Sequence, residues 1–178
     1  ATTLVALAAV ALLPAQQRSV PNVLILTSYP PANEWTSEQI RGISSVLNGA
    51  DSDVAIRVET LDSIRHWSDE SLAAIVDNLR IQFERNPPAL VISTDDEALE
   101  FLLTRRAELF GEAPVVFAGV DRDELIARVE RRYFTGVHEV FSPLHFLDMV
   151  SRLFPDRKTL LFVGDASLAS RGIRAPFM

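Results

Sequence analysis

Short apolar runs alternate with helix-length amphipathic segments along most of this chain. Continuous apolar runs at residues 23–26, 89–92 and 114–118 are typical of strands that are covered on both faces. Apolar and polar side chains alternate over residues 54–58, which indicates a strand at the edge of the sheet. A fifth short strand is expected at residues 134–137.

Helical spacing fills the intervals between these strands. Apolar residues recur three and four positions apart within residues 34–48, 72–83, 98–109 and 125–129. Strands that alternate with helices predict an α/β fold, an open parallel sheet with helices on both faces and right-handed crossovers. An edge position for the second strand fits the strand order 2-1-3-4-5.

After Glu139 the alternation starts again. Residues 144–154 have the spacing of another amphipathic helix, and residues 159–163 read as a sixth strand. A parallel strand is not stable without neighbours. We therefore expect a first lobe over residues 21–139 and the incomplete start of a second lobe over residues 140–178.

The first residues indicate a location. Residues 4–13 contain only Leu, Val and Ala, as in the apolar core of a secretion signal, and the run is too short to span a bilayer comfortably. We expect residues 1–20 to be a partial signal peptide and the protein to be extracytoplasmic (periplasmic), exported or membrane-tethered. A buried N-terminal helix or an uncleaved anchor is the alternative.

Charge and composition exclude several classes of function. The net charge of −7 provides no basic surface for nucleic acid, so no nucleic-acid partner is expected. The chain has no cysteine, which excludes disulfides, thiolate zinc sites and cysteine nucleophiles. Its three histidines lack the spacing of a metal site. We expect neither a metal nor a cofactor.

Polar, aromatic and small residues follow the first, third and fourth predicted strands. In an open α/β sheet, ligands bind beyond the carboxyl ends of the strands, so these residues form one wall of a predicted ligand cleft. The candidate ligand-binding residues are Ser28, Tyr29, Trp35, Ser93, Thr94, Asp95, Asp96, Gly119 and Asp121.

Two parts of this wall have a purely structural alternative. Thr94 can cap the third helix, with Glu97 at the capping-box position, and acidic residues suit a helix N-terminus. Such capping can coexist with ligand contact by Asp95 or Asp96, and catalysis is the least expected role. Tyr29 and Trp35 either contact ligand or cover a helix edge. Because Pro30-Pro31 fixes the loop between them, we favour ligand contact.

Several stretches together resemble a known family. They are V-L-I-L-T-S-Y-P-P from Val23 with W-T at Trp35, P-P-A-L-V-I-S-T-D-D-E-A-L-E-F-L from Pro87, R-A-E-L-F-G-E-A-P-V-V-F-A-G-V from Arg106, and T-G-V-H-E from Thr135. This series resembles the type I periplasmic-binding-protein fold, over about residues 23–165. More narrowly, it is similar to ABC-transporter substrate-binding-protein-like domains related to tryptophan/tyrosine-type receptors. Such domains also serve as extracytoplasmic sensors of histidine kinases and diguanylate cyclases.

The resemblance implies a cleft between two lobes that closes on its ligand like a hinge. The segment from Thr135 to Glu139 resembles the first crossing between lobes, and this adds Glu139 to the candidate ligand-binding residues. We expect a small-molecule-binding sensor domain that is not itself an enzyme, with a transmembrane signalling module as its partner. The alternative is a free substrate-binding protein that serves an ABC permease.

The ligand class rests on the acidic and aromatic character of the predicted wall. Carboxylates and hydroxyls hold an ammonium group by charge-assisted hydrogen bonds, so an amino acid or a related amine is expected, with sugars and purines left open. A phospho-receiver would need clustered acids after the first strand, where Thr27-Ser28-Tyr29 stands. A Rossmann-type enzyme would need G-x-G-x-x-G there, and this motif is also missing.

Overall fold

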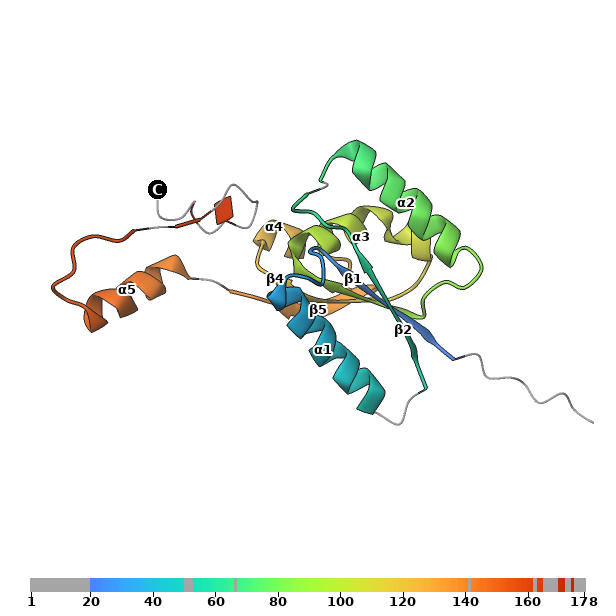
Figure 1. Cartoon of the computed structure of the whole chain (residues 1–178), viewed down its shortest axis with the longest axis horizontal. Coiled ribbons are helices and arrows are strands. Elements are labelled where there is room, and N and C mark those ends of the chain that lie inside the picture. Colours follow the sequence, from blue (N-terminus) through green and yellow to red (C-terminus); the bar gives the residue numbers. More distant parts are fainter. Residues whose placement is uncertain are drawn as a thin grey trace, which may run out of the picture.

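The computed structural model describes residues 20–49, 53–65, 67–140, 142–161, 163–164, 170–171 and 174. A five-stranded, fully parallel sheet of order β2-β1-β3-β4-β5 lies at its centre, with helices on both faces (Figure 1). The strands are β1 (Asn22–Thr27), β2 (Ala55–Thr60), β3 (Leu90–Thr94), β4 (Val115–Val120) and β5 (Phe134–His138). The helices are α1 (Glu34–Gly49), α2 (Asp69–Phe83), α3 (Asp95–Phe110), α4 (Asp123–Ile126) and α5 (Pro143–Leu153).

The predicted α/β class, the parallel sheet and the strand order are thereby confirmed. Each strand and helix predicted from apolar spacing up to residue 154 has a counterpart in the structure. The expected signal peptide lies outside the described residues, apart from Val20.

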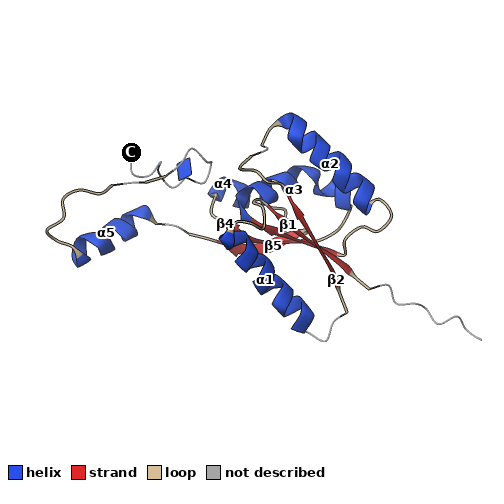
Figure 2. Ribbon diagram, in the orientation of Figure 1, coloured by secondary structure: helices blue, strands red, loops and turns tan. Residues whose placement is uncertain are grey.

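β1 lies inside the sheet, between β2 and β3, and is buried along its whole length. Its side chains alternate between the two faces, as they must in a strand. Val23 and Ile25 pack with Ile92 beneath α1, whereas Leu24 and Leu26 belong to the larger cluster beneath α2 and α3 (Figure 2). The central strand therefore contributes to two separate apolar layers.

The two layers differ in size. Among the described residues, nineteen buried apolar residues form the layer that α2 and α3 share with the sheet, and three form the layer beneath α1. α3 itself has nine buried residues, among them Leu99 and Leu102, while the only buried residue described for α1 is Thr36. α1 is therefore the more weakly packed of the two long helices beside β1.

β2 forms the predicted edge of the sheet. Its residues are exposed or half-buried, in contrast to those of β1 with which it pairs in parallel from Asn22↔Ala55 to Thr27↔Thr60. Because β2 pairs on one side only and its exposed side chains are in part polar, its unpaired edge can face solvent.

α5 extends away from the sheet in Figure 1. Its apolar side chains Leu144, Met149 and Leu153 are exposed, as is Phe154 directly after it. The sixth strand predicted for residues 159–163 is wrong for the described part of that segment, because residues 159–161 and 163 lie outside any strand. Its apolar side chains suit a strand, but no strand among the described residues pairs with it to supply the ladder of hydrogen bonds that a strand requires.

Candidate functional site

The carboxyl ends of the three central strands meet at one edge of the sheet. Thr27 of β1 pairs with Thr94 of β3, and Thr94 pairs with Ala118 of β4. Ser28 and Asp95 directly follow β1 and β3, and Gly119, which precedes the last residue of β4, lies beside Asp95. The connection after β1 leads to one side of the sheet, to β2, and the connection after β3 leads to the other side, to β4. The gap between β1 and β3 is therefore the switch point of the strand order, where ligands bind in open α/β sheets.

Ser28 joins the end of β1 to the first turn of α3. Its Oγ donates to the carbonyl of Thr94 at 2.8 Å and accepts from the backbone N–H of Ala98 at 2.8 Å. Both bonds are buried. The Ser28 hydroxyl thus bridges the Ala98 N–H and the Thr94 carbonyl, the first hydrogen-bonding pair of α3, and caps this turn from outside the helix.

The capping box predicted at Thr94 is wrong. Thr94 stands at the N-cap position in an extended conformation, but its side chain makes no capping hydrogen bond. Ser28 supplies a hydroxyl from another strand instead. A capping box is a pattern within four consecutive residues, and it carries no information about a competing hydroxyl that arrives from the neighbouring strand.

Asp95 is the central side chain of the site. It is only 6% exposed, and its φ of 68° lies in the left-handed region, which Asp tolerates better than most residues. Trp35 Nε1 donates to Asp95 Oδ1 at 2.9 Å, and Gln39 Nε2 donates to the same oxygen at 3.4 Å. Asp95 Oδ2 has no hydrogen-bond partner among the described residues.

Burial raises the pKa of Asp95 to about 6, and the hydrogen bonds from Trp35 and Gln39 oppose that rise. The carboxyl group is therefore mostly ionised at neutral pH and becomes neutral in mildly acidic solution. A buried carboxylate with one unused oxygen can bind a cation or a hydrogen-bond donor.

Gly119 makes the close approach of these elements possible. Its φ is +71°, and a Cβ at this position would lie 2.8 Å from both Asp95 Oδ1 and Gln39 Nε2. Any side chain would press against the hydrogen bond between Gln39 and Asp95. Gly119 therefore allows β4 to pack against the start of α3.

Asp96 connects α3 to the loop after β4. Its Oδ1 accepts from the backbone N–H groups of Asp121, at 3.2 Å, and Arg122, at 3.3 Å. Burial, together with the neighbouring Asp121 carboxyl, raises the pKa of Asp96 to about 7, and the two N–H groups oppose the rise. Asp121 itself is exposed.

Tyr29 adds an aromatic ring to the acidic edge. Its carbonyl accepts from the hydroxyls of Thr27, at 2.9 Å, and Thr60, at 3.0 Å, which fixes the loop after β1. Burial and the negative charge of Glu97 raise the pKa of the Tyr29 hydroxyl, which hydrogen-bonds to the Glu97 carboxyl. The phenol therefore stays neutral and serves as a hydrogen-bond donor.

The structure brings most of the predicted site residues together, but not all. Trp35 is half exposed, and its indole N–H is already occupied by Asp95. Ser93 is fully buried, and its Oγ has no partner among the described residues. The backbone N–H of Glu139 donates to Val120 at 2.7 Å, but its side chain is exposed.

Two residues of α1 belong to this edge and were not predicted. Gln39 bonds to Asp95, and Thr36 is fully buried one turn earlier on the same face of α1. The sequence signal for them is faint. Both precede the apolar stripe of Ile40, Ile43 and Leu47, and polar residues near the start of a helix usually face solvent.

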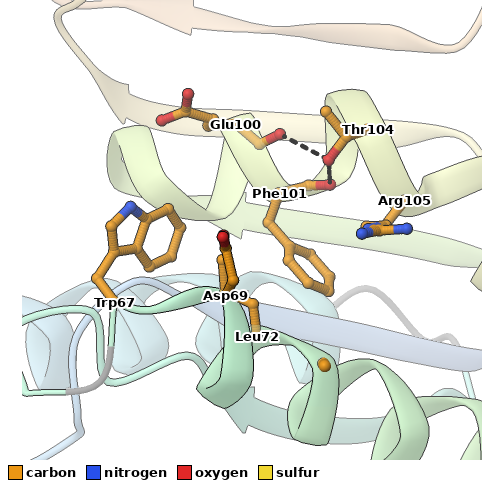
Figure 3. Close-up of a pocket in the computed structure, with 8 residues that line it drawn as sticks. Trp67, Asp69, Leu72, Glu100, Phe101, Thr104 and Arg105 are labelled. Carbon is orange, nitrogen blue, oxygen red and sulfur yellow. Dashed lines mark hydrogen bonds between the residues drawn. The ribbon is translucent and has the colours of Figure 1, made fainter.

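A separate groove of about 350 Å³ lies between α2 and α3 (Figure 3). It is lined by Trp67, Asp69, Leu72, Ala73, Glu100, Phe101, Thr104 and Arg105, none of which is a predicted site residue. Most of its polar groups are engaged elsewhere. Glu100 pairs with Arg122, Arg105 pairs with Glu108, and the Thr104 hydroxyl donates to backbone carbonyls of its own helix. The strand-end residues are therefore the stronger candidate site.

Within the described ranges, no three or more His, Asp or Glu side chains are arranged to hold a metal ion. None of the helices in the described part of the chain has the length and hydrophobicity of a membrane span. Comparison with models of known protein families finds no match, and comparison with curated proteins finds none either.

Proposed function

We propose that this chain is the ligand-binding part of an extracytoplasmic sensor for a small solute. Two features support the proposal. The first is the fold with its strand order, and the second is the resemblance of the sequence motifs at the strand ends to type I periplasmic-binding-like sensor domains. One observation carries it: Asp95 is buried at the switch point of the sheet with an unused carboxylate oxygen. Binding rather than catalysis is the proposed role.

The proposed ligand is a protonated amine such as an amino acid. Asp95, Asp96 and Glu97 place three carboxyl groups at the start of α3, and Tyr29 and Trp35 add aromatic surface beside them. A cation with an apolar body matches a site that combines carboxylates with aromatic rings. In a sensor, such a ligand would act by favouring one of two lobe arrangements.

Thermal unfolding of the purified chain with and without candidate metabolites tests this function. The panel contains amino acids and amines up to millimolar concentrations, with sugars and purines as the other classes. A ligand that binds only the native state stabilises it by about 2.7 kcal/mol at a hundred times its dissociation constant. We expect amines to raise the melting temperature of the wild type and to lose this effect with Asp95→Ala.

A panel in which no solute of any class raises the melting temperature would refute the proposed function. A free substrate-binding protein for an ABC permease is the second candidate, and both candidates share the same site. The reading frame beyond codon 178 distinguishes them. A transmembrane segment followed by a kinase or cyclase module supports the sensor, whereas a stop after a second lobe supports the transport receptor.

A further inference from the structure

The two oxygens of the Asp95 carboxyl group have different environments. Oδ1 accepts from Trp35 Nε1 and from Gln39 Nε2, and Gly119 packs directly against it. Oδ2 is buried, and nothing in the described ranges donates to it. The carboxyl group is thus held by one oxygen, and the other is left as an acceptor.

The Gln39 amide has a defined orientation for the same reason. Its Nε2 donates to Asp95, and the flipped amide would place its oxygen against the carboxylate, acceptor to acceptor. Gln39 Oε1 is therefore fixed as an acceptor, and it too is buried without a donor among the described residues. Gln39 Oε1 and Asp95 Oδ2 belong to the same amide and carboxyl groups as the two atoms of the Gln39–Asp95 hydrogen bond.

A third buried oxygen lies on the same face of α1. Thr36 is fully buried, and its Oγ1 has no partner in the part of the chain that the structure describes. Buried polar atoms are nearly always paired, so the unpaired acceptors of Asp95 and Gln39 indicate a missing donor, while the Thr36 hydroxyl can both donate and accept. The nearest charged donor on the loop after β4, Arg122, already binds Glu100 and Glu124.

We propose that Trp35 and Gln39 are positioning residues that hold Asp95 by Oδ1, so that Asp95 Oδ2 and Gln39 Oε1 select a cation that carries N–H donors. A primary ammonium group satisfies both acceptors. A quaternary ammonium group has the same charge but no N–H, and it leaves them unpaired. This inference rests on the proposed function and specifies its ligand by hydrogen-bond pattern rather than by charge alone.

The test compares two cations with the same charge and the same apolar body, and in the second of them three N-methyl groups replace the three N–H groups. The ¹⁵N-labelled chain is titrated with phenethylamine and with its N,N,N-trimethyl derivative, and backbone amide shifts around Asp95 and Ala98 report binding. We expect the wild type to prefer the primary amine by about tenfold, the equivalent of one charge-assisted hydrogen bond. In Gln39→Met, which keeps the side-chain length, we expect this preference to fall to about twofold.

Gln82→Met on α2 is the matched control, because Gln82 bonds to Asn78 and Arg57 away from the strand ends. It should keep the wild-type preference. Equal affinity of the wild type for the two cations would overturn the inference and leave the proposed function intact. The inference also falls if only a sugar or purine binds. If no solute binds, the proposed function falls with it.

A measurement without ligand tests the positioning role independently. The hydrogen bond from Gln39 lowers the pKa of Asp95. Gln39→Met should therefore raise the Asp95 pKa, as measured by NMR of the side-chain carboxyl carbon, while Gln82→Met should not. An unchanged Asp95 pKa in Gln39→Met would show that Gln39 does not position this carboxyl group.

Discussion

Asp95 shows how one residue can be unfavourable for folding and useful for binding. Its charged form is buried, and the hydrogen bonds from Trp35 and Gln39 to Oδ1 offset only part of the loss of water. Carboxylates at the end of β3 were predictable from the sequence, because they follow an apolar strand. Gln39 was not predictable, since only the packing of α1 across the strand ends gives this ordinary helical glutamine a partner.

Asp95→Asn should make the stability of the protein less dependent on pH. The pKa of Asp95 is raised from 3.8 to about 6 in the folded state, so its stabilising contribution is complete below pH 3.8 and is lost as pH rises through about 6. The full difference is at most about 3 kcal/mol. Asn removes the charge, retains an oxygen for Trp35 and Gln39, and tolerates positive φ.

Urea unfolding at pH 5 and pH 8 measures this effect. The wild type should lose more stability than Asp95→Asn between the two pH values. Asp96 contributes in the same direction, because its pKa is raised to about 7, and therefore Asp96→Asn is the informative companion variant. An identical pH dependence of the wild type and both variants would contradict the buried state of these carboxyl groups.

At the scale of elements, periodicity predicted the strands and helices well, because each must bury a face of defined spacing. Prediction from periodicity failed where a residue depends on a contact with a residue far away in the sequence. α3 begins at the predicted place, but its cap comes from Ser28 rather than Thr94. The predicted sixth strand failed for a related reason, since a strand depends on neighbours that its own residues do not encode.

Ser28→Ala should destabilise the protein by about 1–2 kcal/mol, the range for loss of a helix cap. The variant leaves the Ala98 N–H without its acceptor in a buried position. Ser45→Ala is the control, because Ser45 is exposed on α1 and bonds only to the nearby Gly42 carbonyl. Chemical denaturation of both variants measures the difference, and equal stability would show that Ser28 is not the effective cap.

Gly119→Ala should cost about 1–3 kcal/mol, since it combines positive φ with a close approach to Asp95 and Gln39. Gly42→Ala should instead stabilise the protein. A Cβ at Gly42 meets nothing within 4 Å, and alanine favours the helix by up to about 1 kcal/mol. Thermal unfolding of the two variants should therefore shift in opposite directions. Equal shifts would contradict the packing described at the end of β4.

On the scale of the whole molecule, the sheet separates two layers of unequal strength. In the part of the chain that the structure describes, the layer with α2 and α3 contains nineteen buried apolar residues, and three lie beneath α1 on the other face. The sequence predicted helices on both faces but not this imbalance. Apolar positions in the predicted helices do not show how deeply each one is buried.

Native-state hydrogen exchange should reveal the imbalance. Regions with little buried apolar surface open locally at a low free energy. The amides of α1 should therefore exchange through an opening of lower free energy than the amides of α3. The measurement compares residues in the middle of each helix, away from frayed ends. Uniform protection across α1 and α3 would mean that the two layers open as one unit.

The hydrogen bonds from Trp35 and Gln39 to Asp95 pass over the end of the sheet, from a helix on one face to a helix on the other. These hydrogen bonds connect the weakly packed layer of α1 to the better packed layer of α2 and α3 at the site of Asp95. A solute lodged at this point would strengthen the weaker layer most. Ligand binding would then slow hydrogen exchange of the amides near the C-terminal end of α1, even if the average backbone structure stays the same.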